Sequence, residues 1–337
     1  MVNPKILITG GTGFFGKALL RHQLSLVDSL TSEIFSLSRN PEHFLAAYPE
    51  FTTHHSVTFL KGDILQRNSL PWDQKFSHVL HAATDSTKSP SLTPLQRYDQ
   101  IVDGTRNILD LAVATGARRF LLTSSGAIYG PQPADLAAIP EDWSGSPPLI
   151  EPSTAYGQAK RAAEHLCALV GEQHGLETVV ARCFAFVGPD LPLDVHFAIG
   201  NFIRDALTAD AITVSGDGTP LRTYLDQSDL AHWLSTMLEH GRPGQTYNVG
   251  SNEVISIADL AYLVRDILAP CKPVHILGQP HPGAARNRYV PDIRKAQEAL
   301  GLSVTVPLAE AIRRSGAAIK SLLKNPAVSA KMGQLPS

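Results

Sequence analysis

The stretch ILITGGTGFFG, from Ile6 to Gly16, decides the fold of this chain. It begins with a short apolar run, as expected of a strand buried on both faces of a parallel sheet. Glycines then recur every third residue at Gly10, Gly13 and Gly16, and we expect a helix from Phe14 to Leu26. Such a loop lets backbone approach a pyrophosphate, which the unpaired N–H groups of the helix N-terminus attract. The stretch therefore predicts a nucleotide-binding strand–loop–helix unit.

The spacing is G-x-x-G-x-x-G rather than the better-known dinucleotide pattern G-x-G-x-x-G. A glycine triplet alone is also found in simple turns. The strand before this one and the helix after it favour the nucleotide site over the turn.

Composition excludes several classes of partner. The 337 residues carry 29 Lys and Arg against 31 Asp and Glu, with no basic stripe, which predicts no nucleic-acid or membrane partner. The three cysteines (Cys167, Cys183, Cys271) form no C-x-x-C pair, so we expect buried thiols rather than disulfides or a metal site. Without a signal-peptide pattern or a membrane-length apolar run, a cytoplasmic protein is expected.

Strands and helices alternate along the first half of the chain. Further strands are expected at Glu33–Ser38, Val57–Leu60, His78–Ala83, Arg118–Thr123 and Thr178–Phe184, and helices at Leu92–Thr115 and Ser153–His174. The alternation predicts an α/β fold with a doubly wound parallel sheet. We expect residues 1–188 to form the nucleotide-binding domain, residues 189–325 a mainly substrate-binding lobe with segments that return to that domain, and residues 326–337 a flexible tail.

The end of the second strand bears on the choice of cofactor. An acid there would bond the ribose 2′-hydroxyl of NAD, whereas an arginine suits the 2′-phosphate of NADP. Ser38 and Arg39 occupy this position, and no acid is present. NADP is therefore predicted in preference to NAD, and the alternative is a solvated arginine in a turn.

Residues after the third and fourth strands also face the expected site. Asp63 could accept a hydrogen bond from an adenine amine, or it could cap the next turn. Ala82 and Ala83 are small, so a cofactor could lie flat across the sheet, and His81 is expected to pack beside it rather than to act as a base. Thr84 opens a polar loop, residues 84–86, that we expect to contact substrate.

Tyr156 and Lys160, in the run YGQAK, carry the predicted chemistry. They are four residues apart on an expected helix and so share one face. A nearby ammonium favours the phenolate, so we expect Lys160 to lower the pKa of Tyr156 and to let it exchange a proton with a carbinol or ketone oxygen. Ser125, at the end of the fifth strand, would position that oxygen. The alternative for the pair is a solvated helix face.

Taken together, these motifs resemble the extended short-chain dehydrogenases/reductases. The likeness lies in TGGTGFFG, GDI, HAA, SSGAIYG, YGQAK, RCFAFVGP, GDGTPLRTYL and YNVGS, which span nearly the whole chain. It implies a Rossmann domain, a tightly held NAD(P), a nucleotide-diphosphate sugar in the C-terminal lobe, and a homodimer. The catalytic triad would be Ser125, Tyr156 and Lys160.

The resemblance also outlines two sets of binding residues. The expected cofactor site comprises Gly10, Thr12, Gly13, Phe14, Phe15, Gly16, Ser38, Arg39, Asp63, Ile64, His81, Ala82, Ala83, Thr123, Tyr156, Lys160 and Phe184. The expected substrate site comprises Thr84, Ser125, Asn201, Arg222 and Arg288.

Three of these substrate residues have alternatives. Arg222 matches a diphosphate-binding arginine of the family, or forms a surface ion pair. Arg288 would be a second such arginine, with Arg286 as its rival. Asn201 would supply an amide to the substrate, or lie on a helix surface.

Departures from the family pattern reduce the number of reactions that we expect for this chain. Related 4,6-dehydratases carry an Asp-Glu pair that eliminates water, where this chain has Gly126 and Ala127, so a dehydratase is not expected. Ala185 and Ile101 replace two asparagines that are frequent in the family. The sequence predicts an NADPH-dependent 4-ketoreductase of a nucleotide-linked 4-keto-6-deoxyhexose. The alternatives are an NAD(P)-dependent epimerase and a non-catalytic NADP-binding sensor.

Overall fold

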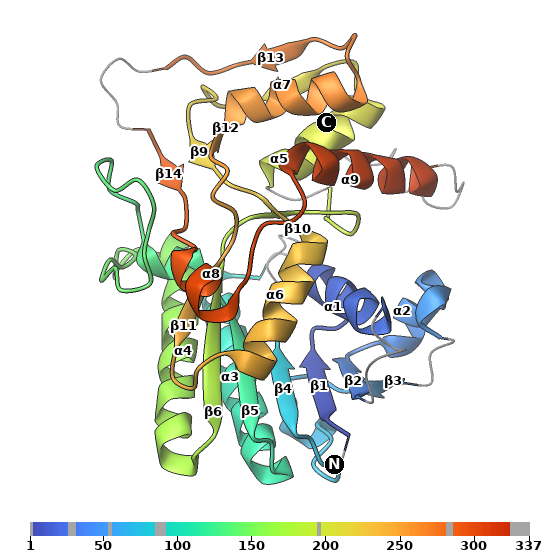
Figure 1. The fold of residues 1–337 in the computed structure, drawn as a ribbon, viewed down its shortest axis with the longest axis vertical. Coiled ribbons are helices and arrows are strands. Elements are labelled where there is room, and N and C mark those ends of the chain that lie inside the picture. The colour runs from blue at the N-terminus through green and yellow to red at the C-terminus, as the bar shows by residue number, and fades with distance from the viewer. Residues whose placement is uncertain are drawn as a thin grey trace.

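The central element of the fold is a seven-stranded parallel sheet (Figure 1). The computed structural model describes residues 3–25, 32–52, 56–84, 92–193, 197–280 and 286–323. The strand order is β11-β6-β5-β4-β1-β2-β3. The strands are β1 (Lys5–Thr9), β2 (Glu33–Ser38), β3 (Val57–Lys61), β4 (His78–His81), β5 (Arg119–Ser125), β6 (Glu177–Cys183) and β11 (Thr246–Val249).

The register of this sheet aligns the carboxyl ends of its strands at one edge. Thr9 of β1 lies beside Leu37 of β2 and His81 of β4, and β5 continues past His81 to Ser125. Every residue of β5 is buried, because it lies near the middle of the sheet with helices on both faces. Ligands of such sheets bind beyond the carboxyl ends. The doubly wound α/β fold predicted from the sequence is confirmed.

Two pairs of long helices cover the sheet. On one face α1 (Phe14–Ser25) packs against α6 (Gln227–His240), whose Trp233 is fully buried. On the other face α3 (Pro94–Thr115) packs against α4 (Ala155–His174). Thr93 begins α3 with a capping box, and Gly175, in the left-handed conformation, ends α4. The short α2 (Pro41–Ala47) follows β2.

A smaller group of elements lies beyond the carboxyl edge of the sheet, at the top of Figure 1. Its helices α5 (Ala198–Thr208), α7 (Ile257–Leu268) and α9 (Leu308–Leu323) bury a separate apolar cluster. Its short strands are β8 (Ile212–Val214), β9 (Leu221–Arg222), β12 (Ile255–Ser256), β13 (Val274–Ile276) and β14 (Arg288–Tyr289). In this group β12 and β14 flank β9.

Several later segments belong to the main sheet or pack against it. Helix α6 and strand β11 do so, and α8 (Arg294–Leu300) packs beside them. The pair β7 (Phe186–Val187) and β10 (Leu225–Asp226) lies between the two groups of elements. Asp190, just after β7, binds Lys17 of α1 across 3.1 Å and also pairs with Arg21. These ion pairs connect the segment after β7 to helix α1.

The structure corrects several details of the prediction. Strand β4 ends at His81 rather than at Ala83, and β5 extends two residues further, to Ser125. Cys271 is exposed in the turn between α7 and β13, whereas the other two cysteines are buried as expected. Helix α9 was not predicted. None of the described helices is long and apolar enough to cross a membrane.

Candidate active site

The glycine loop leaves a backbone cradle between β1 and α1. Gly10 has φ +75°, and a Cβ on it would lie 2.7 Å from the Ala82 carbonyl carbon. A Cβ on Gly16 would penetrate the backbone of Gly11, so helix and strand pack too closely for any side chain. A Cβ on Gly13 would meet nothing nearer than the Gly10 carbonyl oxygen, at 3.4 Å. The loop is thus closed on its protein side and open beside Gly13, which fits a pyrophosphate.

The residues predicted to select the cofactor lie beside this cradle. The hydroxyl of Ser38, at the end of β2, is 3.5 Å from that of Thr12 in the loop. Arg39 is exposed and makes no hydrogen bond or ion pair with any residue that the structure describes. Its guanidinium is therefore available to an anionic group, and Asn40 beyond it caps α2.

Asp63 and Ile64 follow β3 in a turn next to α3. One carboxylate oxygen of Asp63 accepts a hydrogen bond from the Leu65 amide at 3.0 Å, which is the turn-capping alternative for this residue. The carbonyl of Ile64 accepts from Asn107 at 2.8 Å. An adenine contact from Asp63 stays a prediction, because the second carboxylate oxygen takes no part in the turn bond.

His81 is a packed structural side chain. Its Nδ1 is 2.7 Å from the Thr9 hydroxyl, and its Nε2 is 3.3 Å from the hydroxyl of Thr105. Burial, with the nearby Lys160 charge, lowers the pKa of His81 to about 3. It is therefore neutral and engaged on both ring nitrogens, and its place beside a cofactor stays a prediction.

The expected triad converges at the carboxyl end of β5. Ser125 ends that strand, and its Oγ accepts a hydrogen bond from the Ala127 amide at 3.1 Å. Tyr156 and Lys160 lie one turn apart on α4, and the Lys160 ammonium is 6.0 Å from the Tyr156 ring centroid. Ser125 lies close enough to Tyr156 to lower the pKa of its phenol. The structure thus brings together the three residues that the sequence singled out.

Lys160 is held from both sides. Its ammonium donates to the Thr84 hydroxyl at 2.9 Å and to the Thr123 carbonyl at 2.8 Å. Only 3% of the residue is exposed, and this burial lowers its pKa to about 8. Thr84 and Thr123 therefore fix the position of the Lys160 ammonium. Residues 85 and 86, which the sequence analysis also expects to contact substrate, lie outside the described residues.

The pKa of Tyr156 departs from the prediction. Burial raises it above its usual value, and the hydrogen bond from Ser125 lowers it less than burial raises it. The ammonium of Lys160 is engaged elsewhere, so the expected lowering by that charge is wrong for this state of the protein. The phenol is consequently neutral and a proton donor. Arg97 of α3, a cation that the sequence reasoning missed, also lowers this pKa.

Arg222, on β9, is a half-buried cation at the upper side of the site. It forms no ion pair with a carboxylate in the described part of the chain, and its guanidinium donates to the Leu221 carbonyl at 2.8 Å. Burial lowers its pKa. An unpaired, partly desolvated guanidinium favours an anionic ligand over water. The surface ion pair that was the alternative is not found in the described residues.

Arg288 and Asn201 are less clearly part of the site. The pairing of β9 with β14 sets Tyr289 beside Arg222, and Arg288 beside Leu221. Because side chains alternate along a strand, Arg288 and Arg222 project to opposite faces. Asn201, on α5, accepts a hydrogen bond from Arg204 at 3.4 Å. The structure therefore joins Arg222 with Tyr289, a residue absent from the predicted site.

Phe184 and Tyr289 line the site across from Tyr156. Phe184 follows β6, is 9% exposed, and its ring centroid is 4.6 Å from that of Tyr289. Phe184 is thus placed against other protein rings, and a cofactor contact from it stays a prediction. Sequence reasoning missed Tyr289 because it comes from a two-residue strand late in the chain.

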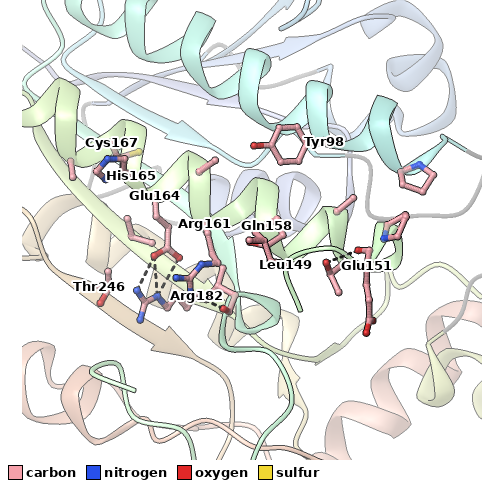
Figure 2. Close-up of a pocket in the computed structure, with 18 of the residues that line it drawn as sticks. Tyr98, Leu149, Glu151, Gln158, Arg161, Glu164, His165, Cys167, Arg182 and Thr246 are labelled. Atoms are coloured by element: carbon pink, nitrogen blue, oxygen red, sulfur yellow. Dashed lines mark hydrogen bonds and ion pairs between the residues drawn. The ribbon is translucent and has the colours of Figure 1, made fainter. Parts of the chain in front are cut away.

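A separate groove runs along the outer side of α4 (Figure 2). Figure 2 shows the Glu164 carboxylate joined to Arg182, at 2.8 Å, on one side of it. Leu149 and Ile150, which are 82% and 91% exposed, lie at its other end. None of the triad residues lines this groove. It lies along α4, the helix that bears Tyr156, and the homodimer stays a prediction.

The described residues contain no group of three or more His, Cys, Asp or Glu that could hold a metal ion. The residues that the structure brings together at this edge of the sheet supply hydroxyls, an ammonium and guanidinium groups. These residues suit proton exchange with an oxygen and binding of anionic ligands.

Comparisons with known proteins agree with this arrangement. The NAD dependent epimerase/dehydratase family matches residues 6–250. UDP-glucuronic acid decarboxylase 1 of Danio rerio is 30% identical over 323 residues, which cover 92% of this chain and 71% of that protein. UDP-glucuronic acid decarboxylase 5 of Arabidopsis thaliana is also 30% identical, over 92% of this chain and 87% of that protein.

Solved structures share the fold at lower identity. A dTDP-glucose 4,6-dehydratase of Streptomyces venezuelae, with NAD bound, is 23% identical with a TM-score of 0.80, over 95% of this chain and 98% of that one. The UDP-glucuronic acid 4-epimerase of Bacillus cereus, with UDP-glucuronic acid and NAD, is 24% identical with a TM-score of 0.79, over 94% and 99%. The chain therefore belongs to the NAD dependent epimerase/dehydratase family, the extended short-chain dehydrogenases/reductases that modify nucleotide sugars.

Proposed function

We propose that this chain is an NADP(H)-dependent 4-ketoreductase that acts on a nucleotide-linked 4-keto-6-deoxyhexose. The end of β2 carries the proposal: Ser38 and the unpaired Arg39 stand where an NAD enzyme has an acid. An arginine there suits the 2′-phosphate of NADP. Cells keep NADPH for net reductions, so the cofactor choice points to reduction of a ketone.

The glycine loop and the triad suit that cofactor and that reaction. The loop beside Gly13 would hold the pyrophosphate, and Thr12, Ser38 and Arg39 would face the adenosine end. The cofactor, when bound, supplies the hydride that reduces C4 of the sugar. Tyr156 donates its phenolic proton to the C4 oxygen, while Ser125 hydrogen-bonds to that oxygen. Arg97, whose charge lowers the pKa of Tyr156, stabilises the phenolate that remains, and solvent returns the proton.

The neutral state of Tyr156 supports the direction of the reaction. A phenol whose pKa is raised by burial carries its proton at neutral pH. Reduction of a ketone needs this protonated form as the proton donor, whereas oxidation of a carbinol needs the phenolate. The ligand-free site therefore holds Tyr156 in the form that reduction requires.

A second candidate is a reaction that takes hydride from C4 and returns it, as in an epimerase. The curated relatives favour it, because they are named as decarboxylases of UDP-glucuronic acid, and a fold neighbour is named as a 4-epimerase. Such an enzyme can keep its cofactor through every turnover. Gly126 and Ala127 place no acid or base beside Ser125, which argues against the water elimination of a dehydratase.

NADPH absorbance in the presence of nucleotide-linked 4-keto-6-deoxy sugars tests the proposal. NADPH loss matched by formation of a deoxysugar supports a reductase. Constant NADPH with a changed sugar would instead support the epimerase. NADPH binding without turnover of any sugar nucleotide would favour the non-catalytic sensor.

Arg39→Asp tests the choice of cofactor. Removing a charge-assisted contact to the 2′-phosphate and adding a repelling carboxylate should lower kcat/KM for NADPH relative to NADH by about 10- to 100-fold. Arg118→Asp is the matched control, because Arg118 lies before β5 at the opposite edge of the sheet. An unchanged ratio in Arg39→Asp would remove the argument for NADP.

Arg222→Met tests the substrate site. Methionine keeps much of the side-chain length of Arg222 but removes its guanidinium charge. Because a charge-assisted contact to the diphosphate is lost, KM for the sugar nucleotide should rise about 10- to 100-fold, with a small change in kcat. Arg242→Met is the control, since Arg242 is exposed in the turn between α6 and β11, at the amino edge of the sheet. An unchanged KM in Arg222→Met, or an equal rise in both variants, would remove Arg222 from the substrate site.

A further inference from the structure

Glu164 of α4 binds two neighbouring strands of the main sheet at once. The register of β5 and β6 sets Ser124 directly beside Arg182. One oxygen of the Glu164 carboxylate accepts from the Ser124 hydroxyl at 2.5 Å. Both oxygens accept from the Arg182 guanidinium, at 2.8 and 3.2 Å (Figure 2). Because Glu164 follows Tyr156 by eight residues on the same helix, this carboxylate joins the helix of the expected acid to the strand that ends at Ser125.

Ser124 and Ser125 leave β5 on opposite faces, because side chains alternate along a strand. Leu122, two residues before Ser124, packs in the apolar cluster that includes Ala163 of α4. Ser124 therefore faces α4, as its bond to Glu164 requires, and Ser125 projects from the same backbone in the other direction. A hydrogen bond that fixes Ser124 thus fixes the backbone that orients Ser125, without a contact to the Ser125 hydroxyl.

Arg182 fixes the chain on the other side of Ser125. The short helical turn Gly126–Tyr129 follows Ser125 directly, and the Tyr129 hydroxyl accepts a hydrogen bond from Arg182 at 2.8 Å. That hydroxyl donates in turn to the side-chain carbonyl of Asn248 on β11, also at 2.8 Å. The residues before and after Ser125 are therefore both held by one ion pair and its hydrogen bonds.

This polar cluster is shielded from water. The side chains of Glu164 and Arg182 are each 12% exposed, and Ser124 is buried. Hydrogen bonds in such surroundings are stronger than in water, and a network whose members all have partners holds a single arrangement.

We propose that Glu164 is a positioning residue, which holds α4 against β5 and so fixes the spacing between Ser125 and Tyr156. The inference rests on the proposed function, because this spacing matters only if the two hydroxyls act together on one substrate oxygen.

Ser124→Ala is the direct test, because Glu164→Ala would leave Arg182 buried without its partner and destabilise the whole fold. Alanine at position 124 removes the hydrogen bond and keeps the ion pair. We expect kcat to fall about tenfold, since a small misplacement of reacting groups is costly, with little change in KM for the sugar nucleotide. Ser315→Ala is the matched control: it removes a buried hydroxyl that donates to the Ala311 carbonyl within α9, and should leave kcat unchanged.

Glu164→Gln separates positioning from stability. Its amide can still bond to the Ser124 hydroxyl, which both donates and accepts, but it no longer balances the charge of Arg182. The thermal midpoint should therefore fall by more than in Ser124→Ala, whereas kcat should fall by less. A loss of kcat that follows the loss of thermal midpoint across the two variants would overturn the inference, because the cluster would then be only structural.

The dependence on Ser125 gives a second readout. In a Ser125→Ala background, Ser124→Ala should change kcat less than about twofold, because the spacing that it disturbs is no longer used. An equal loss of kcat in both backgrounds, or no loss in either, would overturn the inference and leave the proposed function in place. Wild-type protein that moves no hydride to or from any sugar nucleotide would overturn the proposed function, and this inference with it.

Discussion

Replacement of Tyr156 by phenylalanine is expected to lower kcat by about 10²–10⁴-fold while NADPH still binds. The change removes the phenolic proton that is proposed to reach the substrate oxygen, and general acid catalysis typically contributes this much. The ring stays, so packing at the base of the site is kept. Steady-state kinetics give kcat, and NADPH fluorescence gives the affinity of the variant for its cofactor.

Tyr262→Phe is the control for this experiment. Tyr262 lies on α7, is 38% exposed, and stacks with Arg265 far along the chain from the triad. It should leave both kcat and cofactor affinity as they are. Activity retained in Tyr156→Phe would reject Tyr156 as the acid, and loss of cofactor binding would mean that the variant is misfolded rather than inactive.

Replacement of Asp190 by alanine is expected to lower the free energy of unfolding by about 3–5 kcal/mol at pH 7, because it leaves Lys17 buried without its partner. The side chains of Lys17 and Asp190 are 10% and 6% exposed, and their charged atoms are 3.1 Å apart. Arg21 and Gln227 also hold this carboxylate. Urea unfolding followed by circular dichroism measures the loss.

The pH dependence of this loss has a defined sign. Burial alone would raise the pKa of Asp190, but Lys17, Gln227 and Arg21 together lower it. The stability contributed is therefore complete above the unfolded value of about 3.9 and disappears as pH falls through the lower folded pKa. The gap between wild type and variant should be constant from pH 8 to 5 and should narrow below about pH 4.

Asp110→Ala is the control for Asp190→Ala. Asp110 pairs with Arg67 at 2.6 Å, but the two side chains are 41% and 54% exposed. Such a surface pair contributes about 0–1 kcal/mol. Equal losses of unfolding free energy in the two variants would show that Asp190 does not form a stabilising buried ion pair between α1 and the segment after β7.

Features that depend on neighbours in the chain could be predicted from the sequence. The glycine loop is one, since Gly10, Gly13 and Gly16 act on the strand and helix that flank them. The shared face of Tyr156 and Lys160 is another, because it follows from helical spacing alone. Ser125 follows from its place at the end of the fifth strand, and the structure brings Ser125, Tyr156 and Lys160 together at one edge of the sheet.

Features that depend on distant segments could not be predicted. Tyr289 lies beside Gly126 and Arg222 only because β14 pairs with β9 and Val290 donates to Gln132, 158 residues earlier. The raised pKa of Tyr156 reflects burial by the assembled fold, whereas its sequence shows only a lysine four residues away. Both cases concern desolvation and packing between elements, which no local pattern records.

The fate of the hydride tests the central claim most directly. The purified chain would be incubated with NADPH carrying deuterium at the transferable position and with a nucleotide-linked 4-keto-6-deoxy sugar, and the product examined by NMR and mass spectrometry. We expect the sugar product to carry one deuterium at C4 for each NADPH oxidised. The Tyr156→Phe variant should transfer no deuterium to the sugar over the same reaction time. A sugar product that forms without deuterium at C4, while NADPH stays constant, would contradict the reductase and support a reaction that returns the substrate's own hydride.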